Sequence, residues 1–114
     1  MMPMTVEPGV VPVGDEVLPG YRVEALLARG GRVDTYDVTS LERDCRVVVK
    51  AVRPDRAGEE RVREGVLTEG ALLTTLAHPH LVHGYEVVTE PRTALVLETL
   101  PGATLAALIN DRRL

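Results

Sequence analysis

The sequence contains no phenylalanine and no tryptophan, and it has three tyrosines, one cysteine and one lysine. It therefore lacks the aromatic platforms on which single-stranded nucleic acids stack. Its formal net charge of −4 at pH 7 also argues against a protein that is held mainly by phosphate contacts. One cysteine cannot form an internal disulfide, which fits a reducing compartment, and we expect a cytoplasmic location. Nucleic acid is not an expected partner.

The first 20 residues have neither a basic start nor an uninterrupted apolar run, because four prolines divide them. They match neither a signal peptide nor a membrane span, and no membrane segment is expected in this chain. The segment is rich in proline and glycine and shows no period. Residues 1–20 are therefore predicted to form a flexible tail.

The remaining residues, 21–114, are long enough for one domain with a modest core. Three strands are predicted first, because their residues alternate or are rich in β-branched side chains. A helix follows where the apolar period lengthens, and two short strands and a short helix come last. The predicted strands are residues 21–31, 33–40, 45–52, 81–88 and 93–100, and the predicted helices are residues 59–77 and 102–114. This order predicts an α+β fold, a five-stranded antiparallel sheet with one long helix packed on it plus a short C-terminal helix.

The single lysine, Lys50, lies inside the apolar strand predicted for residues 45–52. The other 12 of the 13 lysine and arginine residues are arginines. On the predicted helix, Glu69 lies in the middle of an apolar stripe. The stripe consists of Val62, Val66, Leu73 and Leu76. A carboxylate on the core side of a helix is costly unless a cation meets it, and Lys50 is the natural partner. The alternative is that Glu69 lies at the edge of the stripe and Lys50 extends into water.

Three histidines, His78, His80 and His83, are spaced closely enough to suggest a metal site. Pro79 and the strand predicted next would spread their side chains in different directions. No cysteine or carboxylate cluster completes a set of ligands, so metal binding is not expected here.

Several segments, in order, resemble parts of one known fold. The hairpin from Tyr21 to Tyr36 resembles a glycine-rich hairpin that covers ATP, and "VVVK", ending at Lys50, resembles the strand with the phosphate-binding lysine. "TEGALLTTLAHPHLV" resembles the helix with the paired glutamate and its His-Pro turn, and "ALVLETLPGATL" resembles the following strand, hinge and helix. The chain thus resembles, over residues 21–114, the N-terminal lobe of a serine/threonine protein kinase of the bacterial type.

The resemblance implies a role for each matching position. Lys50 would contact the α- and β-phosphates of ATP and Glu69 would hold it, as the two catalytic residues of this lobe. Leu97 would be the gatekeeper, and the Glu98 carbonyl and the Leu100 amide would bind adenine at the hinge. The implied nucleotide-binding positions are Leu27, Ala28, Gly30, Gly31, Val33, Thr35, Val48, Lys50, Leu97, Glu98 and Leu100.

Four of these positions depart from the family pattern. The loop usually reads G-x-G-x-x-G, but here Ala28 replaces the first glycine and Val33 the last. A β-branched residue at the last position restricts the close backbone approach that glycine allows. Thr35 replaces a valine of the adenine roof, and Val48 replaces an alanine and adds two methyl groups toward the adenine slot. These changes predict weakened or altered nucleotide binding.

The sequence contains no "HRD" catalytic loop and no "DFG" motif. ATP with Mg²⁺ is expected for the family, but the Mg²⁺ ligands are absent, so the chain is not expected to transfer phosphate by itself. One hypothesis is the ATP-binding lobe of a kinase, whose underside a C-terminal lobe would cover. The alternative is a non-catalytic, pseudokinase-like module that binds a protein partner. A third is a small α+β domain of unrelated role.

Overall fold

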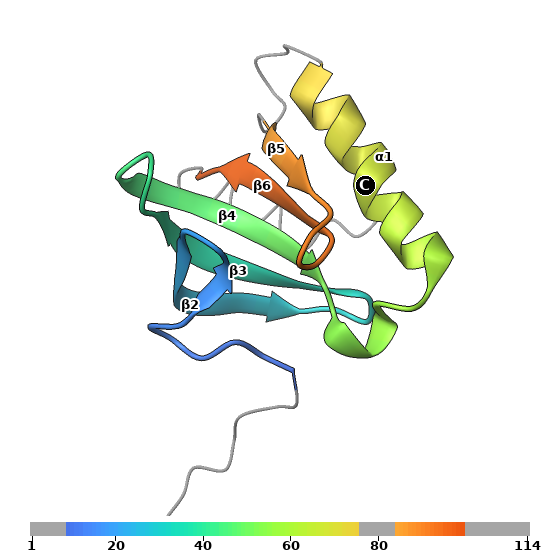
Figure 1. Cartoon of the computed structure of the whole chain (residues 1–114), viewed down its shortest axis with the longest axis horizontal. Helices are drawn as coiled ribbons and strands as arrows, with labels where there is room; N and C mark the ends of the chain where they lie inside the picture. The colour runs from blue at the N-terminus through green and yellow to red at the C-terminus, as the bar shows by residue number, and fades with distance from the viewer. Residues whose placement is uncertain (1–8, 76–83, 100–114) are drawn as a thin grey trace, which may run out of the picture.

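The computed structural model describes residues 9–75 and 84–99 (Figure 1). Its elements are β1 (Glu16–Leu18), β2 (Tyr21–Arg29), β3 (Val33–Ser40), β4 (Cys45–Val52), the 3₁₀ turn η1 (Pro54–Arg56), α1 (Glu60–Thr75), β5 (Gly84–Val88) and β6 (Ala94–Glu98). The strands form one sheet in the order β1-β2-β3-β4-β6-β5, and every neighbouring pair is antiparallel. The α+β class is confirmed. The helix predicted for residues 102–114 lies outside the described residues.

The sheet has six strands, so the prediction of five is wrong. The additional strand, β1, lies inside the segment that was predicted to be a tail, and it pairs Glu16 with Arg22. Val17 and Leu18 are buried in the core. Gly20 has a φ of 87°, which allows a tight turn into β2, and its amide donates to the Glu16 carboxylate at 2.9 Å. Three residues are too few to show a period, which is why the pattern missed this strand.

Strand β4 is buried on both faces, which explains its continuous run of valines. Val47 and Val49 pack on one side in a cluster with Tyr36. Val48 and Val52 point the other way, into a second cluster that includes the apolar side of α1. The first cluster is covered in part by the N-terminal residues, since the partly buried Val10 and Val11 pack against it. Side chains alternate along a strand, so one strand contributes to both cores.

Helix α1 lies beside β5 and β6 (Figure 1). The predicted stripe is confirmed where it is described, because Val62, Val66 and Leu73 are all buried. The closest approach is at Gly70, where an added Cβ would overlap Val87 Cγ2 and come within 3.2 Å of Leu95 Cδ1. Glycine is unfavourable inside a helix, but here it lets the helix axis lie close to the sheet.

The sheet is curled, so that strands far apart in its order meet. Tyr21 on β2 donates from its hydroxyl to Glu86 on β5. Arg43, from the turn between β3 and β4, donates to the same hydroxyl at 2.7 Å and lies over the ring of Tyr85 at 4.7 Å. Burial and the neighbouring Glu86 raise the pKa of Tyr21, so the hydroxyl stays protonated and can donate.

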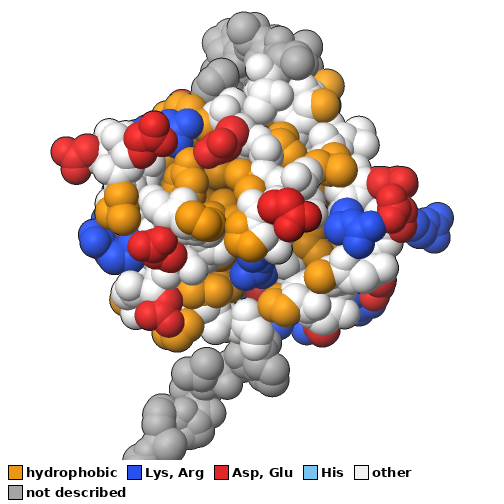
Figure 2. Space-filling view, viewed as in Figure 1, with side chains coloured by type: hydrophobic (Ala, Val, Ile, Leu, Met, Phe, Trp, Pro, Cys, Tyr) orange, Lys and Arg blue, Asp and Glu red, His pale blue; other side chains and the backbone are white. Residues whose placement is uncertain are grey.

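The outer surface is not uniformly polar. On the face viewed in Figure 2, apolar side chains gather over the sheet, with acidic and basic side chains around them. On the helix, Leu67 and Leu72 are exposed although their neighbours in the stripe are buried.

Candidate functional site

Lys50 and Glu69 meet between the sheet and the helix. Alternation along β4 places Lys50 between Val48 and Val52 on the side that faces α1. Lys50 Nζ lies 3.1 Å from Glu69 Oε2, and the two side chains are 12% and 14% exposed. This arrangement differs from the alternative in which Glu69 lies at the edge of the stripe and Lys50 extends into water. The ammonium has a fixed counter-charge in a largely dehydrated position, where an ion pair is stronger than in bulk water.

An apolar wall adjoins this ion pair on the same side of the sheet. Val48 on β4 pairs in register with Leu97 on β6, and both are buried. Leu27 and Val33, from the two arms of the β2–β3 hairpin, pack against the same cluster. Four of the predicted nucleotide-binding positions, Leu27, Val33, Val48 and Leu97, are therefore gathered in one cluster.

Thr35 is buried and pairs in register with Lys50. Glu98 is half-buried at the end of β6, and its register partner is Val47. Leu100, the other predicted hinge position, lies outside the described residues.

The tip of the β2–β3 hairpin is a tight turn. Ala28 pairs with Thr35, and the Gly30 amide donates to the Val33 carbonyl at 2.9 Å. A Cβ at Gly30 would lie 2.9 Å from that same carbonyl oxygen, so a larger residue would force the turn open. Gly31 has open space around it. Gly30 is thus required by a close approach rather than by a positive φ, since the described left-handed glycines are Gly9, Gly14 and Gly20.

Sequence reasoning missed a buried acid beside this turn. Asp34 is fully buried on the opposite face of the hairpin, and Arg29 Nε lies 3.2 Å from its Oδ1. Neither carboxylate oxygen accepts a hydrogen bond from the described residues. Burial raises the pKa of Asp34, and the positive charges of Arg29, Arg53 and Arg92 oppose that rise. Alternation could have revealed Asp34, because it falls in step with the buried Tyr36.

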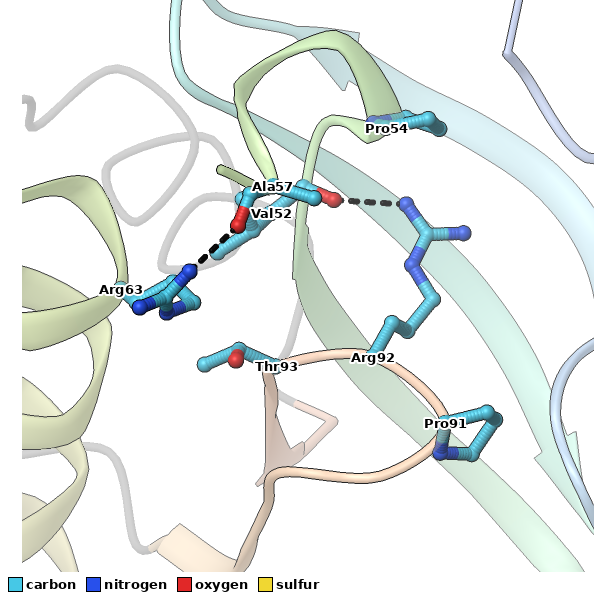
Figure 3. Close-up of a pocket in the computed structure, with 7 residues that line it drawn as sticks. All are labelled: Val52, Pro54, Ala57, Arg63, Pro91, Arg92 and Thr93. Carbon is cyan, nitrogen blue, oxygen red and sulfur yellow. Dashed lines mark hydrogen bonds between the residues drawn. The ribbon is translucent and has the colours of Figure 1, made fainter. Parts of the chain in front are cut away.

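A separate pocket lies between the end of β4, η1, the start of α1 and the turn before β6 (Figure 3). Arg63 donates to the Ala57 carbonyl at 2.6 Å, and Arg92 donates to the Val52 carbonyl at 2.7 Å. Both guanidinium groups therefore brace the backbone around the pocket. None of the predicted nucleotide-binding positions lines it, so this hollow is not the predicted site.

Within residues 9–75 and 84–99 there is no group of three or more histidine, cysteine, aspartate or glutamate side chains placed to hold a metal. His78, His80 and His83 lie outside these ranges. No helix in the described part of the chain is long and apolar enough to cross a membrane.

Searched against protein families, the chain matches no family profile. Among solved structures, it is similar to the kinase domain of PknI from Mycobacterium tuberculosis, with a TM-score of 0.64 and 17% identity over 89% of this chain and 42% of that one. The chain has a kinase-like fold. It is also similar to PpkA-294 in its apo form, with a TM-score of 0.69 and 18% identity over 91% of this chain and 43% of that one.

The kinase-like chain spans less than half the length of either structure. At these identities the likeness concerns the fold alone. It confirms, at that level, the resemblance that the sequence motifs suggested.

Proposed function

We propose that this chain is the nucleotide-binding lobe of a serine/threonine protein kinase. In this proposal Lys50 binds the phosphates of ATP and Glu69 holds Lys50 in place. The observation that carries it is the 3.1 Å ion pair between them, beside the apolar wall formed by Val48 and Leu97. A flexible point charge with a fixed counter-charge suits phosphate binding, because the ammonium is oriented before the ligand arrives.

The adenine end of the site is proposed from the resemblance. The Glu98 carbonyl and the Leu100 amide would contact adenine through the backbone, so their side chains can vary. Val48 and Val33 narrow the space compared with the alanine and glycine of the family pattern. We therefore expect ATP to bind weakly.

Phosphoryl transfer requires bound metal and an oriented nucleophile. The sequence has no "HRD" and no "DFG" motif. The proposed role of this segment is accordingly nucleotide binding. A kinase C-terminal lobe would supply the catalytic base and the Mg²⁺ ligands.

A second candidate function is a non-catalytic module that binds a protein partner. Two observations favour it: Val48 is only 1% exposed, and Leu72 on α1 is 52% exposed. The first shows that neighbouring side chains already cover Val48, and the second is an exposed apolar side chain that a partner could cover.

Nucleotide affinity separates the two candidates. The ATP dissociation constant of the full chain would be measured by calorimetry for the wild type and for Lys50→Met. One lost charge-assisted contact should weaken ATP binding by about 10- to 100-fold while leaving adenosine binding nearly unchanged. Arg61→Ala is the matched control, because Arg61 is exposed on α1 and its substitution also removes one positive charge. ATP affinity that is absent, or independent of Lys50, would favour the partner-binding module.

A further inference from the structure

Two arginines hold the tip of the β2–β3 hairpin by its carbonyl groups. Arg53 Nη1 donates to the Gly30 carbonyl at 2.9 Å, and Arg56 Nε donates to the Gly31 carbonyl at 3.2 Å. Both arginines belong to the connection between β4 and α1, and the tip lies beside this connection in Figure 1. The Arg53 amide also donates to the Arg32 carbonyl at 2.9 Å. Three hydrogen bonds therefore tie the turn to one neighbouring segment.

The arginines are themselves anchored. Arg53 donates to both carboxylate oxygens of Asp55, at 3.0 and 2.9 Å, and Arg56 donates to Glu59 at 2.8 Å. A planar guanidinium that is held by a carboxylate on one side presents its remaining donors in a fixed direction. The Arg53 guanidinium lowers the pKa of Asp55, so this carboxylate stays ionised at neutral pH.

The geometry of the peptide bond connects these contacts to the amides of the turn. In a trans peptide the carbonyl and the following N–H point in opposite directions. The arginine that holds the Gly30 carbonyl therefore directs the Gly31 N–H away from the connection, and the one that holds the Gly31 carbonyl directs the Arg32 N–H the same way. Neither amide donates to any group of the described residues, and both residues are exposed.

We infer that Arg53 and Arg56 are positioning residues, which orient the Gly31 and Arg32 amides as hydrogen-bond donors to a phosphate group of bound nucleotide. This inference rests on the proposed function. Successive N–H groups that point to one side of a turn form a concavity that binds anions. A cation on each carbonyl also polarises the peptide and strengthens its N–H as a donor. The Gly31 and Arg32 amides come before Val33 in the chain. They therefore remain available as donors although Val33 replaces the last glycine of the G-x-G-x-x-G pattern.

The test compares ATP with adenosine, because only ATP carries the phosphates. Arg53→Ala, Arg56→Ala and the double variant of the full chain should each bind ATP more weakly, by about 5- to 20-fold in the double variant. Their adenosine affinity should stay within about twofold of the wild type, since the adenine wall is untouched. Arg61→Ala, with the same loss of charge elsewhere, should change neither affinity.

A purely structural role would affect both ligands together, so the ratio of the two affinities distinguishes it from positioning. Arg56→Ala should disturb the folded structure less than Arg53→Ala, because the Arg56 side chain is 44% exposed. In the wild type, ATP should also shift the ¹⁵N–¹H resonances of Gly31 and Arg32. A wild type that binds ATP, with an unchanged ratio in the variants or with unmoved resonances, would overturn this inference alone. A wild type without ATP affinity would overturn the proposed function as well.

Discussion

Lys50 on β4 and Glu69 on α1 form an ion pair across the interface between the sheet and the helix, with Nζ 3.1 Å from Oε2. The pair links the position of α1 to β4, the strand that carries Lys50, which is proposed to bind phosphate. A displacement of the helix would separate the charges in a site that water reaches poorly. The geometry of the candidate site therefore depends on how firmly α1 is packed.

We expect Glu69→Gln to destabilise the fold by about 1–3 kcal/mol, because it leaves the Lys50 ammonium largely buried without its counter-charge. Lys50→Met should also destabilise, and the double variant should lose less than the sum of the two, by about 1 kcal/mol. Unfolding in urea would give the free energy of unfolding of the wild type, the two single variants and the double variant. Glu64→Gln is the matched control on the exposed side of α1 and should change stability by less than about 0.5 kcal/mol. Strict additivity would show that the ion pair contributes nothing.

Two glycines of α1 should respond to alanine in opposite ways. Gly65 has open space around it, so Gly65→Ala should stabilise by roughly 0.5–1 kcal/mol through helix propensity. Gly70→Ala should destabilise by about 1 kcal/mol net, since overpacking against Val87 and Leu95 exceeds the same gain in propensity. Thermal or urea unfolding compares them. Stabilisation by Gly70→Ala would mean that the helix does not approach β5 and β6 this closely.

The buried carboxylate of Asp34 predicts a dependence of stability on pH. Its pKa in the folded state is raised above the ordinary value of 3.8, so the folded protein retains this proton where the unfolded chain has lost it. Stability contributed by this group is therefore complete below pH 3.8 and falls as pH rises from there to the raised pKa. The free energy of unfolding of the wild type minus that of Asp34→Asn should decrease over this window and then level off. A difference that is constant, or that grows with pH, would contradict the raised pKa.

Strand β1 should contribute to stability although it has only three residues. Leu18 is 2% exposed, and Leu18→Ala should cost about 2–5 kcal/mol through the cavity it leaves. Val13, in the same N-terminal region, is 67% exposed, and Val13→Ala should cost less than about 0.5 kcal/mol. Equal, small effects of the two substitutions would support the tail that the sequence pattern suggested.

Five of the six strands and the long helix could be predicted from sequence because each has a period or a composition that solvent exposure imposes. Tyr36 and Val38 of β3 recur at the period of a strand, the valines of β4 mark a strand buried on both sides, and Val62, Val66 and Leu73 recur at the spacing of a helix. Even the candidate ion pair was suggested by chemistry alone, since Lys50 and Glu69 are each out of place in an apolar pattern unless they meet.

Other features depend on contacts between residues far apart in the chain. β1 is a strand because β2 offers it an edge, and Gly70 is tolerated in a helix because Val87 and Leu95 fill the space beside it. The hydrogen bonds from Arg53 and Arg56 to the glycine turn connect residues that are more than 20 positions apart in the chain. The sequence by itself determined that the apolar side chains of the predicted strands and long helix favour burial and that Lys50 and Glu69 are costly there without a partner, because those requirements are local and follow from hydration. Only the tertiary structure decided which partners they found, because the curl of the sheet and the close approach of α1 set those distances.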